Sequence, residues 1–241
     1  MKIARLVVKL TLAYVLVHSS SSLAIQTKSE TKIQSAFGDK PIVINDYNEQ
    51  LKEVVVDGAS VYFATHDGQY IFAGPIFDTE QRINILSLRE DQLRLSYLRA
   101  LPDNIYVKYP SSSTPSKYEV TVFTDIDCGY CRKFHSNMAR LNKQGISVKY
   151  IMLPRSGVGT KSHTKTIAAL CSDNPAETIT RAMQNIEPIP NNCEGKVMRK
   201  HMEIVQDLKI NNTPTIVLPN GQIKLGLYSP ERLLAVLKEA E

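Results

Sequence analysis

The stretch TVFTDIDCGYCRKF, residues 121–134, decides the fold of this chain. Its first part alternates apolar and polar side chains as a strand does, and it leads directly into Cys128-Gly-Tyr-Cys131. Cysteines at i and i+3 at the start of a helix share a face, so their sulfur atoms come within bonding distance. Such a pair holds a metal, closes a structural disulfide or exchanges disulfides with other proteins, and a strand-to-helix junction favours exchange.

The helix start gives the two cysteines different tasks. Unpaired N–H groups and the helix dipole favour the thiolate at Cys128, and the thiolate is the attacking species in exchange. Cys131 lies one turn inside the helix, where we expect it to be less exposed than Cys128. We therefore predict that Cys128 attacks a substrate disulfide, and that Cys131 resolves the mixed disulfide if the substrate stalls.

Two elements are predicted to contact the substrate. Gly129 keeps the approach to Cys128 open, and Tyr130 offers a flat contact surface. Thr213-Pro214 opens a later strand, and an X-Pro bond adopts the cis form at modest cost. A cis proline beside the nucleophile would leave backbone groups free to pair with an extended peptide. The alternative is a proline on an edge strand.

Two carboxylates flank the nucleophile in the sequence. Asp125 lies three residues before Cys128, and it is either a proton acceptor or relay for Cys131 or a loop carboxylate in solvent. Asp127 is adjacent to Cys128. If its charge lies near the sulfur, it raises the pKa of that thiol and opposes the helix dipole.

The histidines do not favour hydrolytic chemistry. His135 lies one turn beyond Cys131 and is expected at the surface, and nothing in the sequence brings His163 or His201 to the dithiol. A Cys–His nucleophile therefore has little support.

The remaining cysteines favour a structural disulfide. All four cysteines, Cys128, Cys131, Cys171 and Cys193, lie in the second half of the chain. An even number in an exported chain is typical of disulfides. Structural zinc sites usually need two closely spaced ligand pairs, and only one is present, so we predict no metal and no other cofactor. Pairing Cys171 with Cys193 would close a loop of about 20 residues and contribute about 3 kcal/mol through chain entropy. A second redox pair is the alternative.

Residues 1–24 are typical of a cleaved secretory signal peptide. Basic residues precede the short apolar run LTLAYVLV (10–17), and the segment ends in small residues. The run is shorter than the roughly 18 residues that span a bilayer, so we expect export rather than anchoring. Without this segment 26 basic and 24 acidic residues remain. The charge is then close to zero, and without a basic tract interleaved with aromatics nucleic-acid binding is not expected.

Residues 25–87 contain no cysteine and are predicted to be mostly β-structure. Asp57-Gly58 and Asp67-Gly68 separate three apolar runs, which is a hairpin pattern, and residues 31–37 are expected to form a short helix. So small a meander leaves edge strands unpaired. It is either an ordinary N-terminal subdomain or a module that dimerises by joining edge strands across a two-fold axis.

A linker helix is expected over residues 88–102. Ser87 and Glu90 have the spacing of a capping box, and no Gly or Pro occurs before Pro102. Apolar residues fall on two nearly opposite sides, Leu93, Tyr97 and Leu101 on one and Leu88 and Leu95 on the other. The helix is therefore either a bridge that touches a body at each side or a simple amphipathic surface helix.

From Tyr118 the pattern becomes β-α-β, then a helical insert, then β-β-α. Expected strands at 118–125 and 146–153 enclose one helix that continues from Cys131 and ends before Gly145 at the C′ position. Residues 161–209 are predicted to form several helices, and residues 213–227 two strands around Asn220-Gly221. A last helix is expected to begin at Ser229 and Pro230.

Together these features resemble the DsbC/DsbG family of periplasmic disulfide isomerases in the thioredoxin superfamily. The likeness covers essentially the whole chain after residue 24. It is carried by VFTDIDCGYC (122–131), the Cys171/Cys193 pair, NNTPTIVLPNG (211–221), the hairpin-rich start and the connecting helix.

The resemblance implies a mixed α+β and α/β architecture. A thioredoxin-like catalytic domain with a helical insertion (103–241) would be joined by the linker helix (88–102) to a small cystatin-like β-rich dimerisation domain (25–87). The family forms a V-shaped homodimer in the periplasm, with an uncharged cleft for misfolded, disulfide-containing exported proteins. A membrane thiol reductase of the DsbD kind keeps its dithiol reduced.

Carried over to this chain, the family assigns Cys128 as nucleophile, Cys131 as resolving thiol, Thr213-Pro214 as the cis-proline loop and Cys171–Cys193 as the structural disulfide. Two departures lie near the sulfurs and put redox poise and partner choice in question. Asp127 stands where a neutral residue is expected, and Asn211-Asn212 replace a small pair.

We therefore predict a protein disulfide isomerase with chaperone activity. The alternatives within the same chemistry are a net disulfide oxidase and a DsbG-like reductase of sulfenylated cysteines. The alternative from another class is a holdase chaperone that binds unfolded chains without chemistry.

Overall fold

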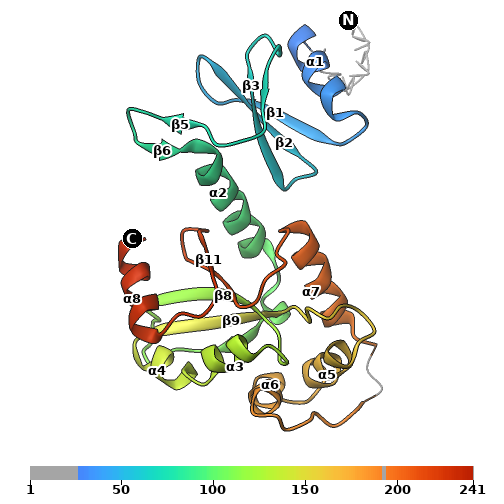
Figure 1. The fold of residues 1–241 in the computed structure, drawn as a ribbon, viewed down its shortest axis with the longest axis vertical. Helices are drawn as coiled ribbons and strands as arrows, with labels where there is room; N and C mark the ends of the chain where they lie inside the picture. The colour runs from blue at the N-terminus through green and yellow to red at the C-terminus, as the bar shows by residue number, and fades with distance from the viewer. Residues whose placement is uncertain (1–26, 192–193, 241) are drawn as a thin grey trace, which may run out of the picture.

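The computed structural model describes residues 27–191 and 194–240, which form two bodies joined by one helix (Figure 1). The predicted signal peptide, residues 1–24, lies outside the described residues. Within the described ranges, no helix is both long enough and apolar enough to cross a bilayer.

The N-terminal body is a four-stranded antiparallel sheet in the order β1-β2-β3-β4, packed on one helix. Its elements are α1 (Lys28–Phe37), β1 (Ile42–Asp46), β2 (Leu51–Val56), β3 (Ser60–Thr65) and β4 (Ile71–Phe72). The turns at Asp57-Gly58 and Asp67-Gly68 join β2 to β3 and β3 to β4, as predicted. Asp57 and Gly58 have φ values of 52° and 69°, in the left-handed region that these residue types tolerate best.

Both faces of this sheet are covered because side chains alternate between the faces of a strand. One face buries Ile33, Val54, Val56 and Ala64. The other face buries Val61, Phe63 and Ile85. The helix α1 therefore packs on one side, and the start of the connecting helix packs on the other.

The connecting helix α2 (Ile85–Ala100) follows a two-stranded ribbon of β5 (Phe77–Asp78) and β6 (Ile83–Asn84). The expected capping box at Ser87 is wrong. Asn84 is the N-cap, and its Oδ1 accepts from the N–H groups of Leu86 and Ser87. Asparagine is as good a cap as serine, so the ribbon that positions Asn84 decides where the helix begins.

The stripe of Leu93, Tyr97 and Leu101 serves both bodies. Leu93 packs on the Val61 and Phe63 cluster, while Tyr97 and Leu101 pack on the C-terminal body. Leu88, on the opposite side, is 40 % exposed. The helix is therefore a bridge, which was one of the two alternatives, and Leu95 from the other predicted side lines a pocket with Tyr118 and Val217 of the C-terminal body.

A buried ion pair fixes the direction in which α2 leaves the sheet. Glu53 on β2 is only 4 % exposed. Arg89 donates from Nε to its Oε1 at 2.7 Å and from Nη2 to its Oε2 at 3.0 Å. This bidentate ion pair restrains the orientation of Arg89 relative to Glu53. Removing either partner would leave the other charge buried and unpaired.

The other end of α2 is held by the turn at Gly221. A Cβ there would lie 2.0 Å from the carbonyl oxygen of Asp91, so only glycine allows the turn to approach the helix this closely. Arg94 donates from Nη1 to the Gly221 carbonyl at 2.6 Å. Tyr97 donates to Asp207 Oδ2 at 2.5 Å. These contacts seat α2 on the C-terminal body.

The C-terminal body is a five-stranded sheet in the order β11-β10-β8-β9-β7. Its strands are β7 (Val107–Tyr109), β8 (Tyr118–Thr124), β9 (Ile146–Met152), β10 (Thr215–Val217) and β11 (Ile223–Leu225). Only β8 and β9 are parallel, and the other neighbours pair antiparallel. The helices are η1 (Asp103–Ile105), α3 (Gly129–His135), α4 (Met138–Lys143), α5 (Lys161–Leu170), α6 (Pro175–Met183), α7 (Lys196–Asp207) and α8 (Pro230–Glu239). The helical insert is α5 to α7, and Ser229 caps α8 as predicted.

The single helix expected after Cys131 is wrong. It divides into α3 and α4 at Ser136 and Asn137. Ser136 Oγ and Asn137 Nδ2 both donate to the carbonyl oxygen of Lys133, and such local side-chain bonds compete with the helix ladder. Gly145 follows α4 with φ of 83°, at the predicted C′ position.

The C-terminal body contains a fully buried histidine, His201. Its Nδ1 accepts from the Met152 N–H at 3.1 Å, and its Nε2 donates to the Ile105 carbonyl at 2.7 Å. This pattern requires the neutral imidazole. Burial lowers the pKa of His201 from 6.5 to about 4.

We predict that His201 makes the folding free energy depend on acid. In the unfolded chain His201 is protonated below about pH 6.5, whereas in the folded chain it stays neutral until the pH falls to about 4. The loss of stability therefore accumulates between these values and reaches about 3 kcal/mol. Glutamine supplies one acceptor and one donor, so His201→Gln should reduce the pH dependence of urea denaturation in this window, leaving the contribution of His135, whose pKa burial also lowers to about 4. His163→Gln is the matched control, and an equal flattening in that variant would contradict the assignment.

Candidate active site

The nucleophile expected from the sequence lies at the start of α3. Cys128 is the N-cap residue, with extended backbone angles of φ −83° and ψ 120°. Its carbonyl accepts from the Arg132 N–H at 3.0 Å, which is the first bond of the helix. The N–H groups of the first turn lack helical partners and face the side of the cap residue, so they stabilise negative charge there.

The two cysteines are buried to nearly the same degree. Cys128 is 2 % exposed and Cys131 is 0 % exposed, and both are free thiols. Cys131 is the less exposed of the two, as expected, but the difference is small, and the Sγ of Cys128 lies 3.6 Å from the Thr213 carbonyl oxygen. The residues between the cysteines provide the access. Tyr130 is 62 % exposed, and a Cβ at Gly129 would meet no atom within 4 Å.

The environment moves the two thiol pKa values in opposite directions. For Cys128, burial alone would raise the pKa, but polar contacts with the Thr213 side chain, the Cys131 thiol and the N–H groups of Cys131 and Tyr130 lower it overall. For Cys131, burial dominates and raises the pKa to about 11. Polar contacts with Thr124, at the end of β8, and with Thr213, in the loop before β10, only partly offset this burial. Cys128 is therefore the stronger acid of the pair.

The Thr213-Pro214 peptide is cis and lies against the nucleophile. The sheet brings it there, because β10 pairs antiparallel with β8 and places Thr215 opposite Phe123. Thr213 therefore reaches the loop that leads from β8 to Cys128. The edge-strand alternative is excluded, since β10 has β8 on one side and β11 on the other.

Asp125 is a buried carboxylate, and the solvent-exposed alternative is wrong. It is 4 % exposed and accepts three hydrogen bonds, from the N–H groups of Asp127 and Arg155 and from Ser162 Oγ. These bonds tie the loop before Cys128 to the segment that leads into α5. They leave Cys131 out, so the proton relay stays a prediction.

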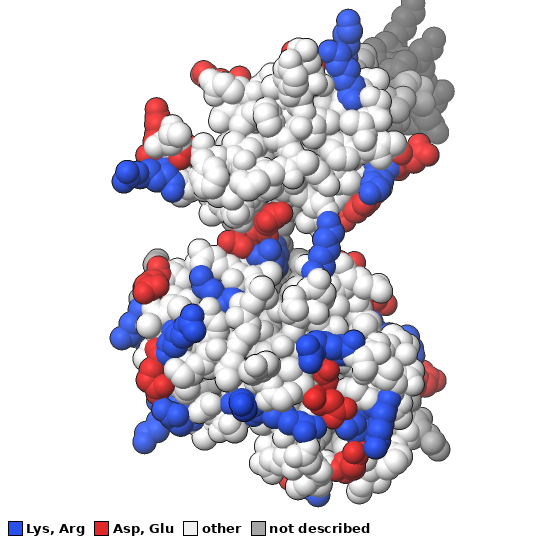
Figure 2. All heavy atoms as spheres, in the orientation of Figure 1, with Lys and Arg blue, Asp and Glu red and all other residues white. Residues whose placement is uncertain are grey.

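Asp127 is held by two cations. Its Oδ1 lies 2.6 Å from Lys165 Nζ and 3.0 Å from Arg132 Nη2. Arg132 also donates from Nε to the Ile126 carbonyl at 2.7 Å and bonds Asn185. Figure 2 shows acidic and basic side chains intermixed on this part of the C-terminal body. The charge next to Cys128 is thus compensated by partners from α3 and α5.

His135 is buried rather than at the surface. It is 6 % exposed, its Nδ1 lies 3.1 Å from Tyr150 Oη, and its Nε2 lies 3.1 Å from Thr180 Oγ1. Burial lowers its pKa to about 4. The spacing could have found this, since His135 is four residues after the buried Cys131 and on the same helix stripe. His201 bonds the backbone elsewhere, and His163 accepts from the Gly159 N–H.

The remaining predicted site concerns the second cysteine pair. Cys171, at the end of α5, is disulfide-bonded. Cys193 lies outside the described residues, so the pairing of these two cysteines stays a prediction. Across the parts of the chain that the structure describes, no cluster of three or more His, Cys, Asp or Glu side chains is arranged to hold a metal ion.

Comparisons with known proteins follow the same division into two bodies. A thioredoxin-like domain matches residues 112–241, which is more than half of the chain. The disulfide bond isomerase protein N-terminal domain matches residues 24–87. The thiol:disulfide interchange protein DsbC of Salmonella typhimurium is 31% identical over 190 residues, which cover 78% of this chain and 76% of that protein.

The chain belongs to the DsbC family of thiol:disulfide interchange proteins. It is a thiol-disulfide oxidoreductase with a Cys128–Cys131 pair at the helix start. The DsbC of Dickeya dadantii is 30% identical over 233 residues, covering 95% of this chain and 91% of the relative, so the likeness extends through both bodies.

Solved structures show the same fold at lower identity. A linker-deletion mutant of Proteus mirabilis ScsC superposes with a TM-score of 0.53 and 20% identity, covering 64% of this chain and 83% of that one. A disulfide interchange protein from Neisseria gonorrhoeae gives a TM-score of 0.51 at 21% identity, covering 58% of this chain and 98% of that one. The expected thioredoxin-like domain with a helical insertion is confirmed.

Several side chains at the site were missed by the sequence analysis. Thr124, Arg132, Ser162 and Lys165 all touch a cysteine, Asp125 or Asp127. The signal for Arg132 was its position directly after Cys131. Ser162 and Lys165 lie more than 30 residues away on α5, and no local pattern marks them.

We predict that the two thiols alkylate at well-separated pH. Because the pKa of Cys128 is lowered and that of Cys131 is raised to about 11, iodoacetamide at neutral pH should label Cys128 while leaving Cys131 unmodified. Rates read by mass spectrometry in Cys131→Ser and Cys128→Ser variants separate the two sites. The denatured chain is the control, in which both thiols should react alike. Equal labelling of both thiols in the folded protein would show that the roles are misassigned.

Proposed function

We propose that this protein isomerises wrong disulfides in exported proteins. The observation that carries the proposal is the division of the dithiol into an acidic Cys128 at a helix start and a buried Cys131 whose pKa is raised to about 11. Both lie against the Thr213-Pro214 loop.

The chemistry begins with the Cys128 thiolate. It attacks one sulfur of a client disulfide, a mixed disulfide forms, and the client's S–S bond breaks to release a client thiolate. That thiolate attacks another disulfide of the client, and a client thiolate finally displaces Cys128, which leaves as it entered. No net electrons are transferred on this route.

Resolution by Cys131 is the competing route. Its thiolate attacks Cys128, the Cys128–Cys131 disulfide forms and the client leaves reduced by two electrons. Because burial raises the pKa of Cys131, little of this thiol is ionised at neutral pH. The mixed disulfide therefore persists long enough for the client to rearrange, which favours isomerisation over simple reduction. Each time the Cys128–Cys131 disulfide forms, a reductase of the DsbD kind would reduce it to the dithiol again.

Client binding is proposed to use residues around the sulfur. Tyr130 is the exposed ring nearest to Cys128 in the sequence, and Val158 is 70 % exposed in the loop after Arg155, which bonds Asp125. An extended client strand would lie along Thr213-Pro214. Exposed apolar side chains suit an enzyme that must accept many different sequences.

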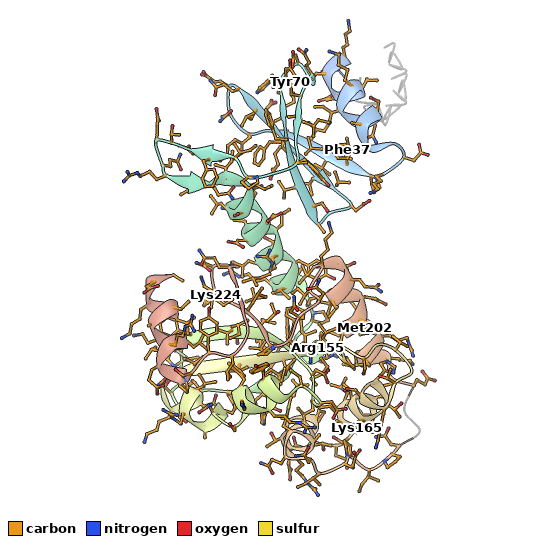
Figure 3. All side chains as sticks on the ribbon, viewed as in Figure 1. Phe37, Tyr70, Arg155, Lys165, Met202 and Lys224 are labelled. Carbon is orange, nitrogen blue, oxygen red and sulfur yellow. The ribbon has the colours of Figure 1, made fainter. Side chains whose placement is uncertain are left out.

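The N-terminal sheet is proposed to form a homodimer. Apolar side chains on its edge strands are exposed, Val43 of β1 at 58 % and Phe72 of β4 at 38 %, and Tyr70, directly before β4, is 59 % exposed. Tyr70 is labelled on this body in Figure 3. Unprotected apolar edges are ready to pair with a second chain.

A chaperone activity is the second candidate. Phe77 and Leu88 are exposed at 68 % and 40 %, and the centre of the N-terminal body is uncharged on the face shown in Figure 2. Such a surface suits unfolded segments. A net oxidase and a reductase of sulfenylated cysteines remain the alternatives within the same chemistry. The resting redox state in the periplasm, where we propose the protein acts after export, separates an oxidase from an isomerase.

Refolding of a scrambled multi-disulfide substrate in reducing buffer should require Cys128. We expect Cys128→Ala to lose the activity, because no other described thiol has a lowered pKa. Cys131→Ala should instead accumulate mixed disulfides with the substrate on non-reducing gels. Full refolding activity of Cys128→Ala would refute the mechanism. Suppression of aggregation that survives loss of both cysteines would identify a separate chaperone activity.

Removal of the N-terminal sheet should give a monomer. A chain that begins near Pro102 should sediment at its own mass and isomerise poorly, while still exchanging disulfides. The same loss of dimer is expected from a full-length Val43→Lys and Phe72→Lys double variant, since charges on edge strands block pairing. Dimers of the truncated chain would place the interface elsewhere.

A further inference from the structure

The carboxylate of Asp127, next to Cys128 in the chain, is paired with two cations. Asp127 immediately precedes the nucleophile, and a bare carboxylate there would oppose the thiolate. Its Oδ1 is bound instead by Lys165 Nζ at 2.6 Å and Arg132 Nη2 at 3.0 Å. The Cys128 sulfur has a different partner, the Thr213 carbonyl. The two adjacent side chains are thus held by different elements of the fold.

The two cations are not equivalent. Arg132 also bonds the Ile126 carbonyl and Asn185, so its guanidinium is built into the loop itself. Lys165 comes from α5, 38 residues from Asp127, and its side chain is only 18 % exposed. Lys165 is labelled in Figure 3 beside the helical insert. Its ammonium contacts only carboxylates among the described residues, Asp127 and, at 3.6 Å, Glu187.

We propose that Lys165 is a positioning residue for thiol–disulfide exchange, which fixes the Asp127 carboxylate on the helical insert and offsets its negative charge next to Cys128 in the chain. The inference rests on the proposed exchange chemistry of Cys128. It assigns the helical insert a part in tuning the nucleophile, and it explains how the chain accommodates an acid at position 127.

The charges around Cys128 decide the sign of the effect. From the loop and α3 come Asp125, Asp127, Arg132 and Lys133, and from the segments packed on them come Arg155, Lys165 and Glu187. Asp125 is already saturated by three hydrogen bonds. The seven groups named above, four cations and three carboxylates, carry one net positive charge. Removing Lys165 leaves zero, and removing the Asp127 charge leaves two.

The experiment measures the pKa of Cys128 in the reduced full-length protein by the ultraviolet absorbance of its thiolate. Lys165→Met should raise this pKa by about 0.5 unit, and Asp127→Asn should lower it by a similar amount. The double variant should return close to the parent value, because the net charge of these groups is then the same as in the parent. High salt should shrink all of these shifts, since partly exposed charges are screened.

Lys161→Met is the matched control. Lys161 is an exposed lysine of the same helix, and its loss removes the same charge without touching Asp127. A shift in Lys165→Met that exceeds the control and is cancelled in the double variant supports the proposal. An unchanged titration in Lys165→Met, or a shift equal to that of Lys161→Met, overturns it. Circular dichroism of each variant checks that the fold is kept.

Failure of the proposed isomerase is a distinct result. If the pKa shifts occur as expected but the parent protein does not refold a scrambled substrate, the Lys165 inference stands and the isomerase proposal fails. If the parent refolds the substrate but Lys165→Met titrates like the parent, the isomerase proposal stands and the inference fails.

Discussion

The contact between the start of α3 and the Thr213-Pro214 loop is the constraint on which the site depends. The Cys128 sulfur lies 3.6 Å from the Thr213 carbonyl oxygen, although 85 residues separate the two in the chain. The antiparallel pairing of β8 with β10 makes the contact, because it places the ends of both strands side by side. Without that register, Cys128 would still cap a helix, but the Thr213-Pro214 loop would not cover its sulfur.

The same contact separates the acidities of the two thiols. A helix start favours a thiolate at its cap residue, while the turn inside is enclosed by β8 and the Thr213 loop. Both thiols lose hydration. For Cys128 hydrogen bonds more than offset this loss and lower the pKa, whereas for Cys131 the loss dominates and raises it. A lowered pKa at Cys128 and a raised pKa at Cys131 suit the proposed isomerase, which would hold its client in a mixed disulfide while the client's disulfides rearrange. The chemistry follows from this difference in acidity between the two thiols more than from any single residue.

The connection between the two bodies is as well defined as the site. Arg89 and Glu53 fix α2 on the N-terminal sheet, and Arg94 and the close approach at Gly221 fix it on the C-terminal sheet. A bridge held at both ends sets a definite direction from the edge strands of one body to the dithiol of the other. In the proposed dimer, that direction would decide how the two dithiols face a client between them.

The sequence by itself determined the elements whose causes are local. Alternation marked β8, the Asp-Gly pairs marked the N-terminal hairpins, and Ser229-Pro230 marked the start of α8, since these signals act within a few residues. The motif around Cys128 likewise placed the nucleophile. Two helix boundaries were missed in the sequence analysis. Local side-chain bonds at Ser136 and Asn137 divide α3 from α4, and Asn84 rather than Ser87 caps α2.

Only the tertiary structure decided what surrounds the sulfurs. The contact of Cys128 with Thr213, two of the three bonds to Asp125, the bonds of the buried His135 and the pairing of Asp127 with Lys165 join segments 15 or more residues apart. Hydration and charge at a site depend on every element packed around it, and the spacing of residues along a chain carries no record of that packing.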